Sequence, residues 1–210
     1  MQATDVQEES MQISAQQVKE LRELTGLGLM ACKSALQEAA GDLAEAEKVL
    51  RKKGMAATAK RAGRTAAEGL VGSYIHVGGK IGVLLEVNCE TDFVARNAEF
   101  QAFVKDLSMH IAATAPLVVS RDDVTPELLQ QEQEIHRAVA ESSGKPEAVV
   151  EKIVTGKMEK FYEQNCLLEQ PFVKDTNVTI GDLVTQAAAK IGENIVVRRF
   201  VRFALGEQSQ

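Results

Sequence analysis

Three stretches rich in β-branched and aliphatic residues constrain the fold of this chain more than any other feature. They cover residues 70–76, 80–89 and 194–205, and each is long enough to form a β-strand. Val77-Gly78-Gly79 separates the first two, and its glycine pair supplies the positive φ values that a tight turn needs. We therefore expect these two stretches to form a β-hairpin and the third to form a long strand.

Helix signals surround the three strand-like stretches. Helices are expected over residues 98–115, 126–143, 146–165 and 180–191. The second begins with Thr125-Pro126, an N-cap followed by a proline at the first helical position. Because a short turn separates it from the third, residues 126–165 are predicted to form an antiparallel helical hairpin. The order of strands and helices favours an α+β fold, with a three-stranded antiparallel sheet packed with helices.

The N-terminal part of the chain is predicted to form a three-helix bundle over residues 14–54. Ser14 and Asp42 each begin a capping box, in which the side chain of a residue three positions later completes the helix start. Gly54 is expected to end the third helix. The turn Thr25-Gly26-Leu27-Gly28 resembles the loop of ubiquitin-associated (UBA-like) three-helix folds.

Composition divides the rest of the chain. Residues 1–13 are rich in Gln and Glu and are expected to be a mobile leader without the basic and apolar regions of a secretory signal. Residues 48–64 contain seven Lys or Arg and no acidic residue. We therefore predict a basic linker over residues 55–69, followed by an α+β core over residues 70–206.

The charge of the whole chain argues against a protein that coats nucleic acid. The formal net charge is −6, whereas such proteins are normally basic. The basic stretch 48–64 keeps open an RNA- or ribosome-binding module, but it contains no aromatic residue on which bases could stack. No apolar run reaches the roughly 18–20 residues that span a membrane. The expected protein is cytoplasmic, without membrane association or direct contact with nucleic acid.

Familiar catalytic motifs are absent from the sequence. It has neither a phosphate-binding glycine loop nor the G-x-S-x-G and H-E-x-x-H patterns. Cys32, Cys89 and Cys166 form no C-x-x-C pair, which indicates reduced thiols in a reducing compartment. An enzyme that uses Cys89, Glu90 or His76 stays open as an alternative, although adjacent residues in a strand point to opposite faces. We predict no catalytic residue, no metal and no cofactor.

The most distinctive segment covers residues 88–97, Asn-Cys-Glu-Thr-Asp-Phe-Val-Ala-Arg-Asn. It joins a predicted strand to a predicted helix and carries a carboxylate, an aromatic ring and a guanidinium. In one interpretation these residues are local structure: Asp92 caps a turn, Phe93 enters the core and Arg96 forms a surface pair. In the other, this is a functional loop on a rigid scaffold. The chain has only seven Phe, two Tyr and no Trp, so an aromatic in a loop needs a reason.

Several further short sequence patterns follow one another along the chain. They are Val-Lys-Glu-Leu-Arg at 18–22, Cys-Lys-Ser-Ala-Leu at 32–36, the motif at 86–97, Met-His-Ile-Ala-Ala at 109–113, Gly-Lys-Pro at 144–146, Gln-Pro-Phe-Val at 170–173 and Ile-Gly-Glu-Asn-Ile at 191–195. In these patterns the chain resembles the elongation factor Ts family over residues 18–206. Longer members have two core subdomains in tandem, whereas this chain has room for one and resembles the short form.

The resemblance implies a guanine-nucleotide exchange factor for the GTPase elongation factor Tu. Such a factor binds the GDP-bound and the nucleotide-free GTPase and promotes GDP release during translation elongation. In the family, the stretch that corresponds to Thr91, Asp92, Phe93 and Val94 enters the GTPase domain, displaces its Mg²⁺ and loosens its phosphate loop.

The resemblance also implies further contacts. Arg22, Leu29, Met30 and His110 match positions that face the GTPase in the family. Leu29 and Met30 suit the core of the three-helix bundle about equally well, and His110 suits a structural role. Short members are expected to be homodimers that supply the missing half in trans, and an exposed sheet edge offers one route to pairing.

Overall fold

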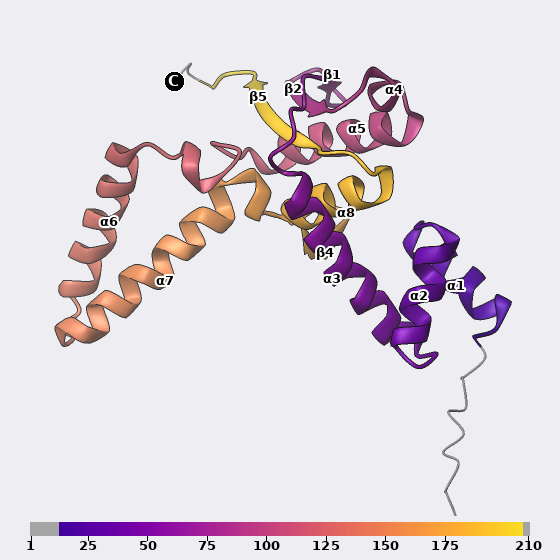
Figure 1. The fold of residues 1–210 in the computed structure, drawn as a ribbon. Helices are drawn as coiled ribbons and strands as arrows, with labels where there is room; N and C mark the ends of the chain where they lie inside the picture. Colours follow the sequence, from indigo (N-terminus) through magenta and orange to yellow (C-terminus); the bar gives the residue numbers. More distant parts are fainter. Residues whose placement is uncertain (1–12, 208–210) are drawn as a thin grey trace, which may run out of the picture.

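The computed structural model describes residues 13–207 and has an α+β fold, as predicted. A helical head lies at one end, an α+β core in the middle, and a helical hairpin projects on the other side (Figure 1). Apart from Ile13, the leader expected over residues 1–13 lies outside the described residues. Over residues 13–207, no helix combines the length and the apolar character needed to cross a membrane.

The head contains helices α1 (Ala15–Thr25), α2 (Leu29–Glu38) and α3 (Leu43–Arg61). Both predicted N-caps are present: the Ser14 hydroxyl accepts a hydrogen bond from the Gln17 backbone N–H, and the Asp42 carboxylate accepts one from that of Glu45. The three helices enclose a small core made by Leu21, Cys32, Ala35, Leu36, Ala46 and Leu50. The three-helix prediction is therefore confirmed.

The expected helix end at Gly54 is wrong, because α3 continues through Gly54 to Arg61. A Cβ atom added at Gly54 would lie 3.2 Å from the Ala189 Cβ of helix α8 (Ile180–Ile191). The missing side chain thus lets α3 and α8 approach closely. Arg51 adds an ion pair with Asp182 at 3.1 Å. Helix α3 therefore extends from the head to the core, and part of the predicted linker is helical.

The core is built on a three-stranded antiparallel sheet of β1 (Glu68–Ile75), β2 (Ile81–Cys89) and β5 (Val196–Ala204). The spatial order is β1-β2-β5, so the hairpin receives the long C-terminal strand beside β2. Gly78 and Gly79 have φ values of 93° and 67°, as the turn requires. Val83, Leu85, Val87 and Cys89 point from β2 into the core, where they meet residues of α5 (Ala98–Thr114) and α8.

The other face of the sheet is exposed. The strand register places alternate residues on this face, with Leu84 of β2 opposite Ser73 of β1 and Val201 of β5. The exposed apolar residues there are Val71, Ile75, Leu84, Val201 and Phe203. We call these five side chains the outer sheet face. An ion pair between Glu86 and Arg199, at 2.7 Å, lies on the same side.

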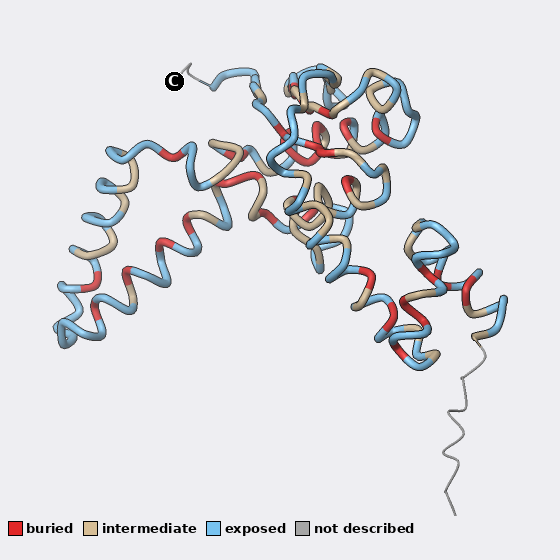
Figure 2. Tube along the Cα trace, in the orientation of Figure 1, coloured by how far each residue is buried: buried red, intermediate tan, exposed pale blue. Residues whose placement is uncertain are grey.

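The predicted helical hairpin is confirmed as α6 (Pro126–Glu141) and α7 (Glu147–Asn165). Buried residues recur along α7 (Figure 2). Together with Ala140 and the partly buried Leu128 and Leu129 of α6, they form a separate small core. Short 3₁₀ turns at Arg121–Asp123 and Leu167–Glu169 lie at its base, where Arg121 pairs with Glu159 and Glu169. A small sheet of β3 (Pro171–Phe172) and β4 (Asp175–Thr179) was not predicted, because such short strands show no clear alternation.

Candidate functional site

The segment after β2 forms one helical turn, α4 (Asp92–Ala95), rather than an irregular loop. Thr91 is its N-cap, and the Thr91 hydroxyl accepts a hydrogen bond from the Val94 backbone N–H at 3.5 Å. At the other end, the Asn97 N–H donates to the Val94 carbonyl at 2.9 Å. The turn is thus defined by local hydrogen bonds at both ends.

Phe93 projects from α4 into solvent with 86% of its surface exposed. Val94 and Ala95 on the other side of the turn pack against the main core. The interpretation that placed Phe93 in the core and made Asp92 the cap is therefore wrong on both points, because the cap is Thr91. The surface pair of that interpretation is present, with Asp92 and Arg96 2.9 Å apart. An exposed aromatic ring on an anchored turn is suited to burial against another protein.

Residues far along the chain hold this turn in place. The Glu90 carboxylate accepts a hydrogen bond from the Asn194 N–H at 2.7 Å and pairs with Arg64 at 3.5 Å. The Asn194 amide in turn donates to the Arg64 carbonyl at 2.9 Å. The neighbouring Glu193 also contacts the segment. Sequence reasoning placed Arg64 in the basic stretch 48–64 and Glu193 and Asn194 in the pattern at 191–195. It linked none of them to residues 88–97, because nothing local to that motif indicates that they come close.

The alternative of an enzyme gains no support from the geometry. Cys89 is fully buried, its Sγ donates to the Thr91 carbonyl at 3.1 Å, and burial raises the pKa of its thiol, which keeps the thiol protonated and unreactive. His76 lies beside the hairpin turn, at the opposite end of the hairpin from Cys89, where it contacts the Tyr74 hydroxyl at 3.1 Å. Among the described residues, no three His, Cys, Asp or Glu side chains gather as a metal site would need.

The predicted contact residues of the head lie at the surface. Arg22 is exposed on α1, and Leu29 and Met30 at the start of α2 are 54% and 73% exposed. The alternative of Leu29 and Met30 as bundle core is therefore wrong. Arg22 and Leu29 line one hollow of about 380 Å³ on the head. α4 lies well apart from this surface (Figure 1), so one partner would have to extend over both.

His110 lies inside the core and exposes no surface. Its Nε2 lies 2.9 Å from the Gln170 side-chain oxygen, and its Nδ1 accepts a hydrogen bond from the Val173 backbone N–H at 3.3 Å. Both ring nitrogens therefore have partners within the chain. This arrangement matches the structural alternative for His110 and leaves no atom of its ring free for a direct contact with another protein in this conformation.

Burial of His110 predicts that the free energy of unfolding falls as the pH drops below about 6.5. Desolvation lowers the pKa of folded His110 from 6.5, so the unfolded chain takes up this proton at a higher pH. The stabilisation is complete above the unfolded pKa and is lost as the pH falls toward the folded pKa, with a slope of at most about 1.4 kcal/mol per pH unit. The free energy of unfolding, measured with urea at several pH values, should depend less steeply on pH in His110→Gln than in His76→Gln. An equal pH dependence in the two variants would contradict the prediction.

The basic stretch 48–64 is partly neutralised by acidic neighbours. Four of its seven cations, Lys48, Arg51, Lys53 and Arg64, pair with Glu45, Asp182, Glu38 and Glu90 respectively. These pairs lower the positive potential that an RNA contact would use. The structure therefore adds no support to the RNA-binding alternative.

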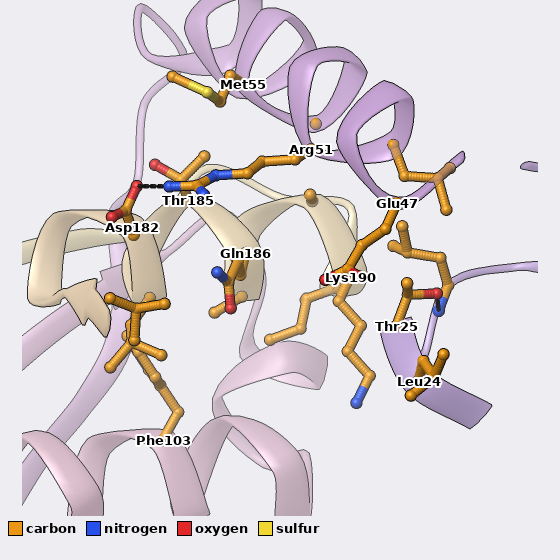
Figure 3. A pocket seen from close by; sticks show the side chains of 18 of the residues that line it. Leu24, Thr25, Glu47, Arg51, Met55, Phe103, Asp182, Thr185, Gln186 and Lys190 are labelled. Carbon is orange, nitrogen blue, oxygen red and sulfur yellow. Dashed lines mark hydrogen bonds and ion pairs between the residues drawn. The ribbon is translucent and has the colours of Figure 1, made fainter. Parts of the chain in front are cut away.

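A pocket of about 420 Å³ lies between α3, α8 and the end of α1 (Figure 3). Its lining is mixed, with apolar Leu24, Met55 and Phe103 and with the Arg51–Asp182 ion pair at one side. The pocket marks the junction between head and core, and its side chains form no constellation typical of catalysis.

The fold and the exposed side chains together define an α+β protein that presents apolar residues from a rigid scaffold, as protein-binding factors do. Comparison with known proteins narrows this class. A family model described as Elongation factor TS matches residues 2–207. The chain therefore belongs to the elongation factor Ts family, and with it to the translation elongation factors of protein biosynthesis.

Individual relatives agree with this assignment. Elongation factor Ts of Geotalea uraniireducens (strain Rf4) is 60% identical over 197 residues, which cover 94% of this chain and 91% of the relative. Elongation factor Ts of Geobacter sulfurreducens has the same identity and coverage. Elongation factor Ts of Carboxydothermus hydrogenoformans is 58% identical over 195 residues, or 93% of this chain and 90% of that protein.

Proposed function

We propose that the chain is a guanine-nucleotide exchange factor for elongation factor Tu. It binds the GDP-bound GTPase, promotes GDP release and binds the nucleotide-free form. Membership of the elongation factor Ts family supports the choice of partner and reaction. The observation that carries the proposal is the 86% exposure of Phe93 on a turn anchored in the core.

The residues of α4 and its cap have separate proposed roles. Phe93 enters the GTPase and gains apolar burial, which favours a partner conformation that has lost its Mg²⁺ and holds GDP weakly. By reciprocity, each tenfold preference for the nucleotide-free partner weakens GDP binding by about 1.4 kcal/mol. Asp92 accepts hydrogen bonds from the disturbed partner, Thr91 caps the turn, and Val94 anchors it. No chemical bond changes, so the factor needs no catalytic residue, metal or cofactor of its own.

A second contact is proposed for the head. Arg22, Leu29 and Met30 are exposed there, as a contact surface requires. The cation and the two apolar side chains suit a partner surface with an acidic group beside an apolar area. His110 is not included, because it is buried in the core.

The factor is proposed to act as a homodimer in the cytoplasm, without contact to a membrane or to nucleic acid. The outer sheet face supports the dimer, because five exposed apolar side chains side by side on one surface would gain from burial against a second copy. Two copies would then together present two copies of α4.

Release of a fluorescent GDP analogue from elongation factor Tu tests the proposal directly. The preloaded GTPase is mixed with excess unlabelled GDP, with and without this chain, and the fluorescence decay is followed by stopped flow. We expect the chain to accelerate release in a concentration-dependent, saturable manner. A release rate that this chain leaves unchanged would refute the exchange function.

Asp92→Asn should slow the stimulated release tenfold or more, because a hydrogen bond that involves a charged group is worth about 1.5–3 kcal/mol and every 1.4 kcal/mol or so is a factor of ten. The substitution keeps the shape of the side chain and removes its charge, and the Asp92–Arg96 pair is exposed at the surface, so folding should change little. Asp122→Asn alters an exposed aspartate in a 3₁₀ turn and serves as the control. Equal release rates for Asp92→Asn and the wild type would remove Asp92 from the mechanism.

A further inference from the structure

The Glu193 carboxylate accepts three hydrogen bonds from the two residues that precede α4. Its Oε2 accepts from the backbone N–H groups of Glu90 and Thr91, each at 3.0 Å. Its Oε1 accepts from the Thr91 hydroxyl at 2.6 Å. One side chain from the far end of the sequence thus fixes both the backbone and the capping side chain at the start of this turn.

The position of Glu193 follows from the end of α8. Gly192 has a φ of 90° and ends that helix in the left-handed region, which directs the chain back toward β2. Asn194, the residue after Glu193, donates its backbone N–H to the Glu90 carboxylate at 2.7 Å. The two segments are therefore linked in both directions: Glu193 accepts from the backbone at Glu90, and Glu90 accepts from the backbone at Asn194.

The contact with the Thr91 hydroxyl determines how α4 begins. Because this hydroxyl donates its proton to Glu193, its lone pairs are available to the Val94 N–H at 3.5 Å. The cap and the carboxylate therefore form one chain of hydrogen bonds that ends in the helical turn. The direction in which Phe93 leaves the surface depends on that turn, since Phe93 lies between the cap and Val94.

We propose that Glu193 is a positioning residue for nucleotide exchange: it holds the cap of α4 so that Phe93 is presented in the orientation that enters the partner. This inference rests on the proposed exchange function. Glu193 acts through Phe93 and needs no contact with GDP or Mg²⁺. Without the carboxylate, two backbone N–H groups and the hydroxyl lose their acceptor, and the turn samples other orientations.

Three variants test this role. Glu193→Ala removes all three acceptor contacts, whereas Glu193→Gln keeps a carbonyl oxygen for the backbone N–H groups and an amide that can donate to the Thr91 hydroxyl. Asp123→Ala is the matched control, because Asp123 likewise accepts from a backbone N–H and a hydroxyl, both of Ser120, at 2.8 Å. Asp123 lies in a 3₁₀ turn at the base of the hairpin and has no proposed role in exchange.

The stimulated GDP release at saturating factor should fall about tenfold in Glu193→Ala, because a small displacement of a positioned group has large effects on rate. The concentration for half-maximal stimulation should change less, since the head contacts remain. Glu193→Gln should recover most of the rate, and Asp123→Ala should match the wild type. In amide hydrogen exchange on the free factor, Glu193→Ala should lose protection at Glu90 and Thr91 and keep it at Leu85.

A double variant separates positioning from general stability. If Glu193 acts through Phe93, Glu193→Ala adds little to the loss already caused by Phe93→Ala. If the fold losses in stimulated GDP release of the two single variants multiply in the double variant, the inference is overturned. It is also overturned if Glu193→Ala releases GDP at the wild-type rate while Phe93→Ala is impaired. If the wild-type factor does not accelerate release at all, the exchange function itself fails, and the positioning role is refuted with it.

Discussion

Replacing Phe93 with alanine should reduce the stimulated release of GDP from elongation factor Tu by at least 30-fold. A central aromatic residue in a protein interface typically contributes about 2 kcal/mol or more, which corresponds to roughly that factor. Phe93 is 86% exposed in the free chain, so its burial in the partner is a net gain that alanine cannot reproduce. Stopped-flow release of a fluorescent GDP analogue at saturating factor gives the rate.

The same exposure predicts that Phe93→Ala folds normally. A side chain with so little surface buried contributes little to the core, and the change in the free energy of unfolding should stay within about 0.5 kcal/mol. Val77→Ala is a suitable control, because Val77 is 92% exposed and lies in the turn at the other end of the β1–β2 hairpin. A stable Phe93→Ala variant with full exchange activity would contradict the proposed entry of Phe93 into the GTPase and leave the family assignment intact.

Much of the fold could be predicted because its signals are local. The N-caps at Ser14, Asp42 and Thr125 satisfy backbone N–H groups within three residues of themselves, so a short sequence pattern identifies them. The hairpin turn at Gly78-Gly79 is equally local. The end of α3 was predicted wrongly at Gly54, because the reason for that glycine is the approach of α8 more than a hundred residues later. A local pattern cannot distinguish a glycine that ends a helix from one that lets two helices meet.

In the candidate site, too, local signals could be read from the sequence and contacts between distant residues could not. The motif at residues 88–97 marked the segment, but a four-residue helix is too short for periodicity to show which side chains face the core. The structure was needed to show that Phe93 points outward while Val94 and Ala95 point inward. The partners of this turn, Glu193 and Asn194, lie between α8 and β5, and their pattern at 191–195 does not show that they contact residues 88–97. Tertiary contacts therefore explain what the sequence pattern left undecided.

Charge introduced on the outer sheet face should convert the proposed dimer to monomers. Phe203 is 67% exposed and lies opposite Gly82 of the central strand, beside the neighbouring pair Leu84–Val201. In a two-fold interface Phe203→Glu occurs twice, so two carboxylates would be brought into one apolar contact. We expect the dissociation constant to rise about 100-fold or more, because like charges brought together in an interface cost several kcal/mol.

Sedimentation equilibrium at micromolar concentration measures the dimer dissociation constant of the wild type and of Phe203→Glu. The fold offers a control variant outside the sheet. Val139→Glu places the same charge on α6, where Val139 is 65% exposed on the projecting hairpin, and it should leave the mass unchanged. A monomeric wild type would refute the dimer. A dimeric Phe203→Glu variant would instead exclude the outer sheet face and point to pairing through an edge strand, because β1 and β5 are both edges of the sheet and their backbone groups tolerate an outward carboxylate.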